Sequence, residues 1–395
     1  MTAVRRDAHR GTVPMWRDVR VLRIAAQLLV VLIVISIIAF MAANFATATA
    51  ERGLGFGFSF LGRQAGFDIS ESLIPYSSTD TYSTAFIVGL LNTLFVSAVG
   101  IVLATILGIA VGVARLSPNW LLNRVAAGYV ELMRNTPLLL QLVILNFVVF
   151  LQLPSVRESL AIGDAAFLNQ RGLYLPGPSP GGGFGLWLGF CGAAIAVVPL
   201  SRVVARRLED AGRPSHRLRT LGVLAALALP VVGWTVAGGA PVTFEFPVLG
   251  RFNFSGGIAL STGFTALLIG LVIYTAAFIG EVVRGGIQAV RRGQLEAARA
   301  LGLSEGQVLR LVIFPQALRI IVPPLTSQYL NLTKNSSLAI AVGYSDLFKI
   351  GQTMSNQTGQ PLPVIILMMG TYLVISLATS LLMNLYNRRV QVLER

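Results

Sequence analysis

The chain of 395 residues has very few of the side chains on which metal and redox chemistry depend. It contains one cysteine, Cys191, and two histidines, His9 and His216. A single cysteine cannot form an intramolecular disulfide, and neither residue type is present in the spacing of a zinc site. We therefore expect no metal site and no catalytic residue in this chain.

Lysine is also rare, and its positions exclude a nucleotide-binding loop. Lys334 and Lys349 follow Thr333 and Phe348, so the chain contains no Gly-Lys dipeptide. A Walker A loop needs that dipeptide to hold the phosphates of a nucleotide. We expect this chain to bind neither ATP nor Mg²⁺, so that any ATP hydrolysis occurs on another chain.

Charged residues of all kinds make up only 12% of the chain, and 54% of its residues are hydrophobic. A soluble domain would carry about 25% charged residues. The mean hydropathy of +0.71 points in the same direction. The composition therefore predicts an integral membrane protein, and its membrane-length segments predict an all-α one, because a helix satisfies its own backbone hydrogen bonds in lipid.

The basic residues are distributed unevenly across the predicted membrane. All but six of the 31 lysines and arginines fall in or beside segments assigned to one side. The six exceptions are Arg52, Arg63, Arg157, Arg171, Arg251 and Lys349. This asymmetry follows the positive-inside rule. The net charge of +14 therefore reflects topology and does not indicate a nucleic-acid site.

Apolar segments predict the path of the chain, since a bilayer core about 30 Å thick needs about 20 helical residues. We predict eight spans with both termini cytoplasmic: residues 21–43, 86–115, 137–153, 187–204, 221–236, 263–283, 337–348 and 363–387. Ala46-Thr47-Ala48 imitates a signal-peptidase site. The apolar run before it exceeds the ~7–15 residues of a cleaved signal, which favours a retained first span.

A polar segment between two of these spans is the longest charge-bearing run within the membrane part of the sequence. Residues 296–301 are good helix formers, and Gly302 can take the left-handed conformation that ends a helix. Ser304 precedes Gln307 by three residues, the spacing of a capping box. We predict two short helices with a sharp bend, the second interrupted by Pro315. Such a rigid unit is suited to transmit movement between this chain and a partner.

The same segment resembles the EAA loop of ABC importer permeases. The matching residues are Glu296, Ala297, Ala298, Gly302, Val312, Phe314 and Pro315, with Phe314 where the family usually has leucine. The flanking Gly293-Gln294 and Pro315-Gln316-Ala317 resemble the polar amino-acid uptake family, which includes the histidine- and glutamine-type permeases. The resemblance implies that a partner ATPase is contacted by Glu296, Ala297, Ala298, Gly302 and Leu303.

Further motifs resemble the same family. Tyr129–Pro137 resembles its Tyr-x-Glu-x-x-Arg-x-Thr-Pro signature, and Asn92-Thr93 resembles the element that opens its core. Lys334–Leu338 resembles its Lys-x-Thr-Ser-Leu motif, with Ser336 in place of threonine. The long insertion after residue 153 is similar to that of the larger permease of general L-amino-acid importers. The resemblance implies a type I ABC importer permease core of five helices in a bacterial inner membrane.

These features divide the chain into four regions. Residues 1–81 hold the cytoplasmic N-terminus, the first span and a periplasmic segment. Residues 82–153 form the first part of the permease core, in which Gly108 and Gly112 allow close helix packing. Residues 154–261 are an insertion with two spans, an even number that preserves the sidedness of the later spans, and with a short hairpin at 243–254. Residues 262–395 form the second part of the core and include the coupling loop.

Polar side chains within the spans are candidates for a substrate pathway, because such groups usually face protein or a water-filled cavity. They are Asn92, Gln141, Asn146, Gln328 and Asn335. Gln141 and Asn146 are five residues apart, about 140° around a helix, so at most one should face a given cavity. Two acid–base pairs three residues apart are candidate gating ion pairs or plain local pairs: Glu131 with Arg134, and Glu281 with Arg284.

The sequence favours the membrane subunit of an ATP-driven amino-acid importer, which forms half of a translocation pore. The resemblance implies two ATPase subunits, a second permease that is a related but different chain, and a periplasmic amino-acid-binding protein. The alternative is a secondary transporter driven by an ion gradient, which has no use for the coupling loop. A membrane enzyme is disfavoured by the shortage of catalytic side chains, and a membrane scaffold would have no transport activity.

Overall fold

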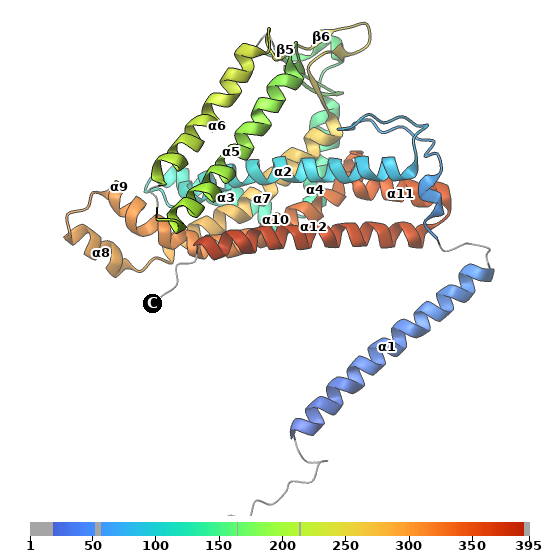
Figure 1. Cartoon of the computed structure of the whole chain (residues 1–395). Coiled ribbons are helices and arrows are strands. Elements are labelled where there is room, and N and C mark those ends of the chain that lie inside the picture. The colour runs from blue at the N-terminus through green and yellow to red at the C-terminus, as the bar shows by residue number, and fades with distance from the viewer. Residues whose placement is uncertain (1–18, 52–56, 164, 213–214, 391–395) are drawn as a thin grey trace, which may run out of the picture.

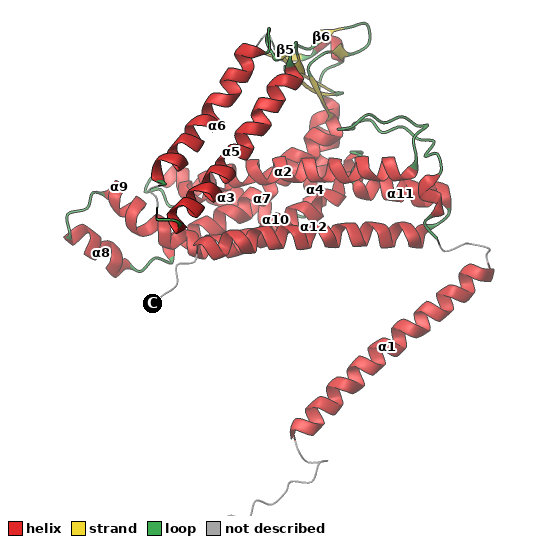
Figure 2. Ribbon diagram, in the orientation of Figure 1, coloured by secondary structure: helices red, strands yellow, loops and turns green. Residues whose placement is uncertain are grey.

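The computed structural model describes residues 19–51, 57–163, 165–212 and 215–390, and its membrane part is helical (Figures 1 and 2). Within these ranges seven helices are long and apolar enough to cross a membrane, and an eighth span results if one bent helix pair is counted. The prediction of about eight spans agrees with this count. The basic stretch before residue 19 and the last five residues, both predicted to be cytoplasmic, lie outside the described residues.

The long helices follow one another through the whole described chain. They are α1 (Val19–Glu51), α2 (Tyr82–Ala114), α5 (Phe184–Asp210), α6 (His216–Val236), α7 (Thr262–Gln288), α10 (Phe314–Asn335) and α12 (Pro361–Val390). The shorter ones are α3 (Trp120–Asn135), α4 (Leu138–Val143), α8 (Arg292–Ala300), α9 (Glu305–Gln307) and α11 (Leu347–Thr358). Helix α1 stands apart from the bundle, and none of its apolar window is buried (Figure 1).

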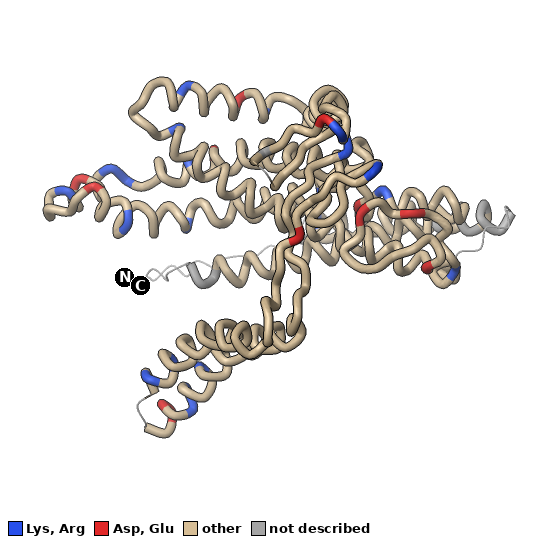
Figure 3. The backbone as a smooth tube through the Cα atoms, turned by 90° about the horizontal axis from the view of Figure 1, so that it is seen from above, with Lys and Arg blue, Asp and Glu red and all other residues tan. Residues whose placement is uncertain are grey.

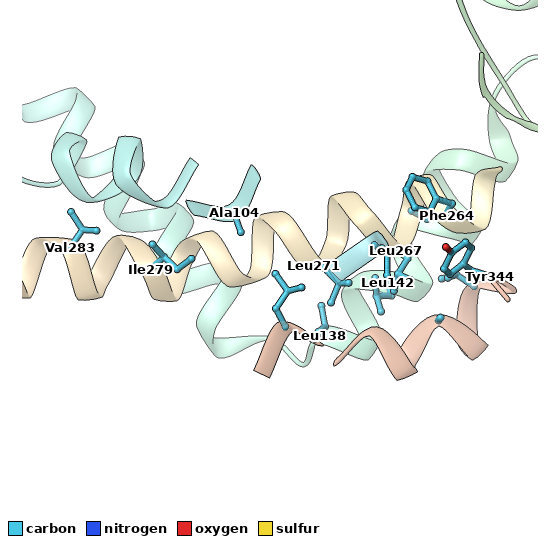
Figure 4. Packing of buried hydrophobic residues seen from close by; sticks show 14 of the residues in the cluster. Ala104, Leu138, Leu142, Phe264, Leu267, Leu271, Ile279, Val283 and Tyr344 are labelled. Carbon is cyan, nitrogen blue, oxygen red and sulfur yellow. The ribbon is translucent and has the colours of Figure 1, made fainter. Parts of the chain in front are cut away.

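The core forms around the crossing of α2 and α7, which pack along much of their lengths. Glycines make this approach possible: a Cβ on Gly108 would lie 2.5 Å from Cγ2 of Ile279. A Cβ on Gly112 would lie 2.7 Å from the carbonyl oxygen of Gly280. Leucines of α7 and α4 fill the same core farther along, as Figure 4 shows. The predicted glycine pair thus lies at a close contact of the two helices.

The helix after the coupling loop differs from the prediction. Residues 308–313 form a π-helix that continues directly into α10, so the interruption predicted at Pro315 is wrong. Pro315 is the second residue of α10 and follows the π-helix without a break in the helical run. Pro323 and Pro324 also lie inside α10, as membrane helices tolerate.

The span predicted at residues 337–348 is therefore wrong as well. The helical run that includes α10 crosses the membrane, and the predicted segment is instead a 3₁₀ turn that ends at Gly343, followed by the start of α11. Gly343 has a φ of 81°, a conformation that favours glycine. Lys334, near the end of α10, consequently lies at the opposite end of that helix from the coupling loop, and not on the side predicted for it.

The inserted region combines a helical hairpin with small sheets. Helices α5 and α6 pack on each other far more than on any core helix. Strands β1 (Leu160–Ile162), β2 (Ala166–Asn169), β3 (Gly172–Leu175) and β8 (Ile258–Ser261) form an antiparallel sheet in the order β1-β2-β3-β8. β4 (Gly177–Pro180) pairs with β5 (Val242–Glu245), and β6 (Val248–Leu249) with β7 (Phe254–Ser255). The hairpin predicted at 243–254 is thus limited to β6 and β7. All these strands gather at one end of the molecule (Figure 2).

Candidate functional site

The coupling loop, residues 291–313, projects beyond the ends of the core helices and contains α8 and α9 (Figure 1). Helix α8 ends in a Schellman motif, because the N–H of Gly302 donates to the carbonyl of Arg299 at 2.9 Å and that of Leu303 to Ala298 at 3.3 Å. Gly302 has a φ of 80°, as this motif requires. The bend predicted at Gly302 is therefore present.

Side chains fix the angle between the two helices of the coupling loop. The predicted capping box is present: the backbone N–H of Ser304 donates to Oε1 of Gln307 at 2.9 Å. Arg299 spans the bend with two hydrogen bonds to Glu305, at 2.8 and 3.1 Å. This guanidinium lowers the pKa of the Glu305 carboxyl below its usual range. The loop is thus a rigid bent pair of helices and not a flexible connection.

The predicted coupling residues divide into two groups by exposure. Glu296, Ala297 and Gly302 are exposed, whereas Ala298 is buried and Leu303 half-buried against the rest of the loop. The sequence analysis did not single out Leu301, whose side chain is 82% exposed at the tip of the bend. This apolar side chain is therefore available for contact with a partner. One indication of this exposure is present in the sequence, because Leu301 directly precedes the glycine at which α8 ends.

A cluster of charged side chains joins α2 to α7 close to the coupling loop. Glu281 accepts hydrogen bonds from Arg284 on its own helix and from Arg115 at the end of α2. Arg284 in turn donates to Gln288 at 2.6 Å. The predicted Glu281–Arg284 pair is present, but Arg115, which the sequence analysis did not connect with it, makes the pair a clamp between two helices.

Removing the charge of this clamp should destabilise the protein. We expect Glu281→Gln to lower the free energy of unfolding by about 1–2 kcal/mol, because two partly buried arginines lose their charged acceptor. Denaturant unfolding in detergent measures the change. The matched control is Glu305→Gln, whose carboxylate pairs with Arg299 in full solvent and should matter little. Equal losses in both variants would contradict a stabilising clamp.

The other predicted ion pair is not formed within the described part of the chain. Glu131 is exposed and has no ion-pair partner there. Arg134 instead lies over the ring of Phe278 on α7, with its guanidinium carbon 5.4 Å from the ring centroid. Helix α3 packs against α7, which places Arg134 beside that ring. Arg134 therefore holds α3 by a cation–π contact.

Asn92 lies in the half of α2 that is remote from the coupling loop and is only 2% exposed. Its Nδ2 donates to the carbonyls of Glu71 and Ser345, both at 2.8 Å. Thr93 accepts the backbone N–H of Leu347 at 3.0 Å through its hydroxyl. These two residues fasten the external segment and the turn before α11 to α2. Asn92 also lines a cavity of about 490 Å³ beside Glu71, where burial raises the pKa of the Glu71 carboxyl.

The two amides of the third span have different surroundings. Gln141 braces the 105° bend between α3 and α4: its Nε2 donates to the carbonyls of Met133 and Thr136 and, at 2.7 Å, to the hydroxyl of Thr136. Asn146 is buried in the π-helix that continues α4. They do not meet, as predicted from their spacing. Gln141 has a structural role that the sequence did not reveal.

Gln328 and Asn335 lie seven residues apart on α10 and therefore on one face of that helix. Asn331 falls on the same face between them and is exposed. Among the described residues, none of these three side chains has a hydrogen-bond partner. Together they form a polar stripe, residues 328, 331 and 335, along a membrane-spanning helix. Of the five predicted pathway residues, the structure thus brings only Gln328 and Asn335 together.

Comparison with known proteins assigns the chain to a protein family. The family described as "Binding-protein-dependent transport system inner membrane component" matches residues 104–392, which include the coupling loop, the clamp and the polar stripe. The chain belongs to this family. It is accordingly a multi-pass permease subunit of an inner membrane.

Full-length relatives of this permease support the assignment. It is 47% identical to YhdX of Escherichia coli strain K12, described as an amino-acid ABC transporter permease, over 93% of this chain and 94% of that one. It is 44% identical to the general L-amino acid transport system permease AapQ of Rhizobium johnstonii, over 93% and 92%. It is 41% identical to the glutamate/glutamine/aspartate/asparagine transport permease BztB of Rhodobacter capsulatus, over 96% of each chain. The inserted hairpin therefore lies within the matched length.

Proposed function

We propose that the chain is one half of the translocation pore of an ATP-driven amino-acid importer. The observation that carries the proposal is the coupling loop, a rigid bent pair of helices that projects from the membrane helices with Glu296 and Leu301 exposed. A rigid helix can transmit displacement from a motor subunit, which a secondary transporter would not need. The amino-acid permeases among its relatives support this substrate class.

The complex would contain two ATPase subunits, and one of them would dock on this coupling loop through Glu296, Ala297 and Leu301 around Gly302, with Ala298 and Leu303 holding the loop in shape. ATP and Mg²⁺ would bind to those subunits, since this chain has no nucleotide-binding loop. A periplasmic binding protein would deliver the amino acid to the opposite face. In this arrangement both termini are cytoplasmic.

A second permease subunit is supported by the polar stripe on α10. Amide side chains along a membrane helix are costly in lipid and usually face protein or a cavity. Residues 328, 331 and 335 find no partner in the described chain, so the other half of the pore would cover them. We propose a related but different chain as that half, and Gln328, Asn335 and Asn146 as pathway residues. Asn92 would act at the outer end, and the clamp at Glu281 would serve as the inner gate.

The test is affinity purification of the tagged chain in mild detergent, followed by reconstitution of the complex with its binding protein. We expect an ATPase and a second permease to co-purify, and uptake of radiolabelled amino acids to require internal ATP. Collapse of proton and sodium gradients should leave uptake unchanged. A chain that purifies alone and transports only with an ion gradient would overturn the proposal.

A further inference from the structure

The hairpin of α5 and α6 is a separate unit on the side of the permease. Small residues bring its helices together: a Cβ on Gly222 would lie 2.1 Å from Oγ of Ser201, and one on Gly233 would lie 2.6 Å from Cβ of Phe190. Most of its large apolar side chains, such as Ile195 and Leu227, remain exposed. Figure 3 shows its end at the α5–α6 turn well apart from the core helices. This surface must be covered by lipid or by another protein.

The end of the hairpin near the sheets carries two tryptophans. Trp187 and Trp234 pack edge to face, with ring centroids 6.1 Å apart. The indole N–H of Trp187 donates to the carbonyl of Pro230 at 3.1 Å. Tryptophan is enriched where a membrane protein crosses the boundary between lipid and water. The pair marks this boundary on the outer side.

The opposite end, the hairpin tip (residues 202–219), carries an excess of positive charge (Figure 3). Glu209 is already engaged, because it accepts hydrogen bonds from Arg219 at 2.6 Å and from Ser215. Four other arginines of the tip are exposed and have no acidic partner among the described residues: Arg202, Arg206, Arg207 and Arg217. Asp210 is the remaining acidic residue of the tip, so a positive excess remains there.

The spacing of the two ends matches a bilayer. Arg206 follows Trp187 by 19 residues on one helix, which corresponds to about 28 Å. The hydrocarbon core of a bilayer is about 30 Å thick. Arg202 and Arg206 are four residues apart and therefore lie on one face, where their guanidinium groups can reach the same layer of phosphates. The match places the charged tip at the level of the phosphate groups, where anionic headgroups are within its reach.

We propose that the hairpin tip binds anionic phospholipids through Arg202, Arg206, Arg207 and Arg217. The apolar faces of α5 and α6 then contact acyl chains, while the guanidinium groups hold phosphate headgroups of the cytoplasmic leaflet. The insertion thereby gives the permease a preference for anionic lipid that its transport core does not need. This inference concerns lipid binding alone and stands apart from the transport function.

Native mass spectrometry of the purified full-length chain tests the proposal. The protein is equilibrated with equal amounts of phosphatidylglycerol and phosphatidylcholine that have the same acyl chains, and the bound lipids are counted. We expect the wild type to retain phosphatidylglycerol preferentially. The variant R202Q/R206Q/R207Q/R217Q should lower this preference on the order of tenfold, because each arginine near an anionic surface contributes measurably to binding.

Two matched variants keep the test decisive. R63Q/R157Q/R171Q/R251Q removes the same charge from the outer side and should keep the lipid preference. Lysine at the four tip positions retains the charge and should keep most of it, which separates a loss of binding from a loss of folding. An unchanged preference after neutralisation of the tip would overturn the proposal. So would release of a protein subunit by that variant without any change in lipid selectivity.

Discussion

Replacing Gly302 by aspartate should abolish transport while the chain remains folded in the membrane. Nothing lies within 4 Å of a Cβ at this position, and aspartate is among the residues that tolerate a φ of 80°. The new carboxylate would point outward from the bend beside Leu301, where we propose that the ATPase docks. An unpaired charge buried in an interface costs about 2–5 kcal/mol. We therefore expect ATP-driven uptake to fall at least about 30-fold.

Uptake into proteoliposomes measures this effect, and the amount of inserted chain is measured in parallel. Gly302→Asn is the matched control, since asparagine has the same size and the same tolerance for the left-handed conformation but no charge. It should retain far more uptake than the aspartate variant. Full activity of Gly302→Asp would count against docking at the bend. Loss of the inserted chain would show that the bend is needed for folding.

Replacing Gly112 by leucine should have the largest effect on stability. A Cβ there would meet the carbonyl oxygen of Gly280 at 2.7 Å and Cβ of Val283 at 2.8 Å, and neither atom can move without moving α7. The two helices would have to separate, which would also pull Arg115 away from Glu281. Overpacking of this kind costs about 3 kcal/mol. We expect a clear fall in the thermal unfolding midpoint in detergent.

Gly128→Leu on α3 is the control for this second substitution. Nothing lies within 4 Å of a Cβ at Gly128, and leucine forms helices better than glycine does. This variant should be as stable as the wild type or slightly more stable. If the two leucine variants unfolded at the same temperature, the close crossing of α2 and α7 would not be the structural centre of the molecule.

The coupling loop could be predicted from the sequence because its structure depends on neighbouring residues. Gly302 ends α8, and Ser304 with Gln307 starts α9, through hydrogen bonds that span only three to five residues. Gly108 and Gly112 were likewise recognisable from their spacing. The family motif added the function of the loop, although its contacts with an ATPase stay a prediction.

Other features depend on residues far apart in the chain, and the sequence alone could not reveal them. Arg115 meets Glu281 across 166 positions, and Asn92 meets Ser345 across 253. Gln141 was expected to line a cavity, but it braces the bend between α3 and α4. Nothing in the sequence indicated that the chain would bend at Thr136. The path of α10 was misjudged for a different reason: its prolines were given the weight that they have in water-soluble helices, whereas lipid leaves a helix few alternatives.

The way in which α2 is fastened has a mechanical consequence. Asn92 and Thr93 tie its outer half to the turn before α11, Gly108 and Gly112 pack against α7 near its inner end, and Arg115 at that end bonds to Glu281. Because α2 and α7 also pack along much of their lengths, we expect a force from the coupling loop to move these two helices together. The π-helix at residues 308–313, the last part of the coupling loop, continues directly into α10. A movement of the coupling loop caused by an ATPase would thus be transmitted to α10, and it would shift the polar stripe on that helix.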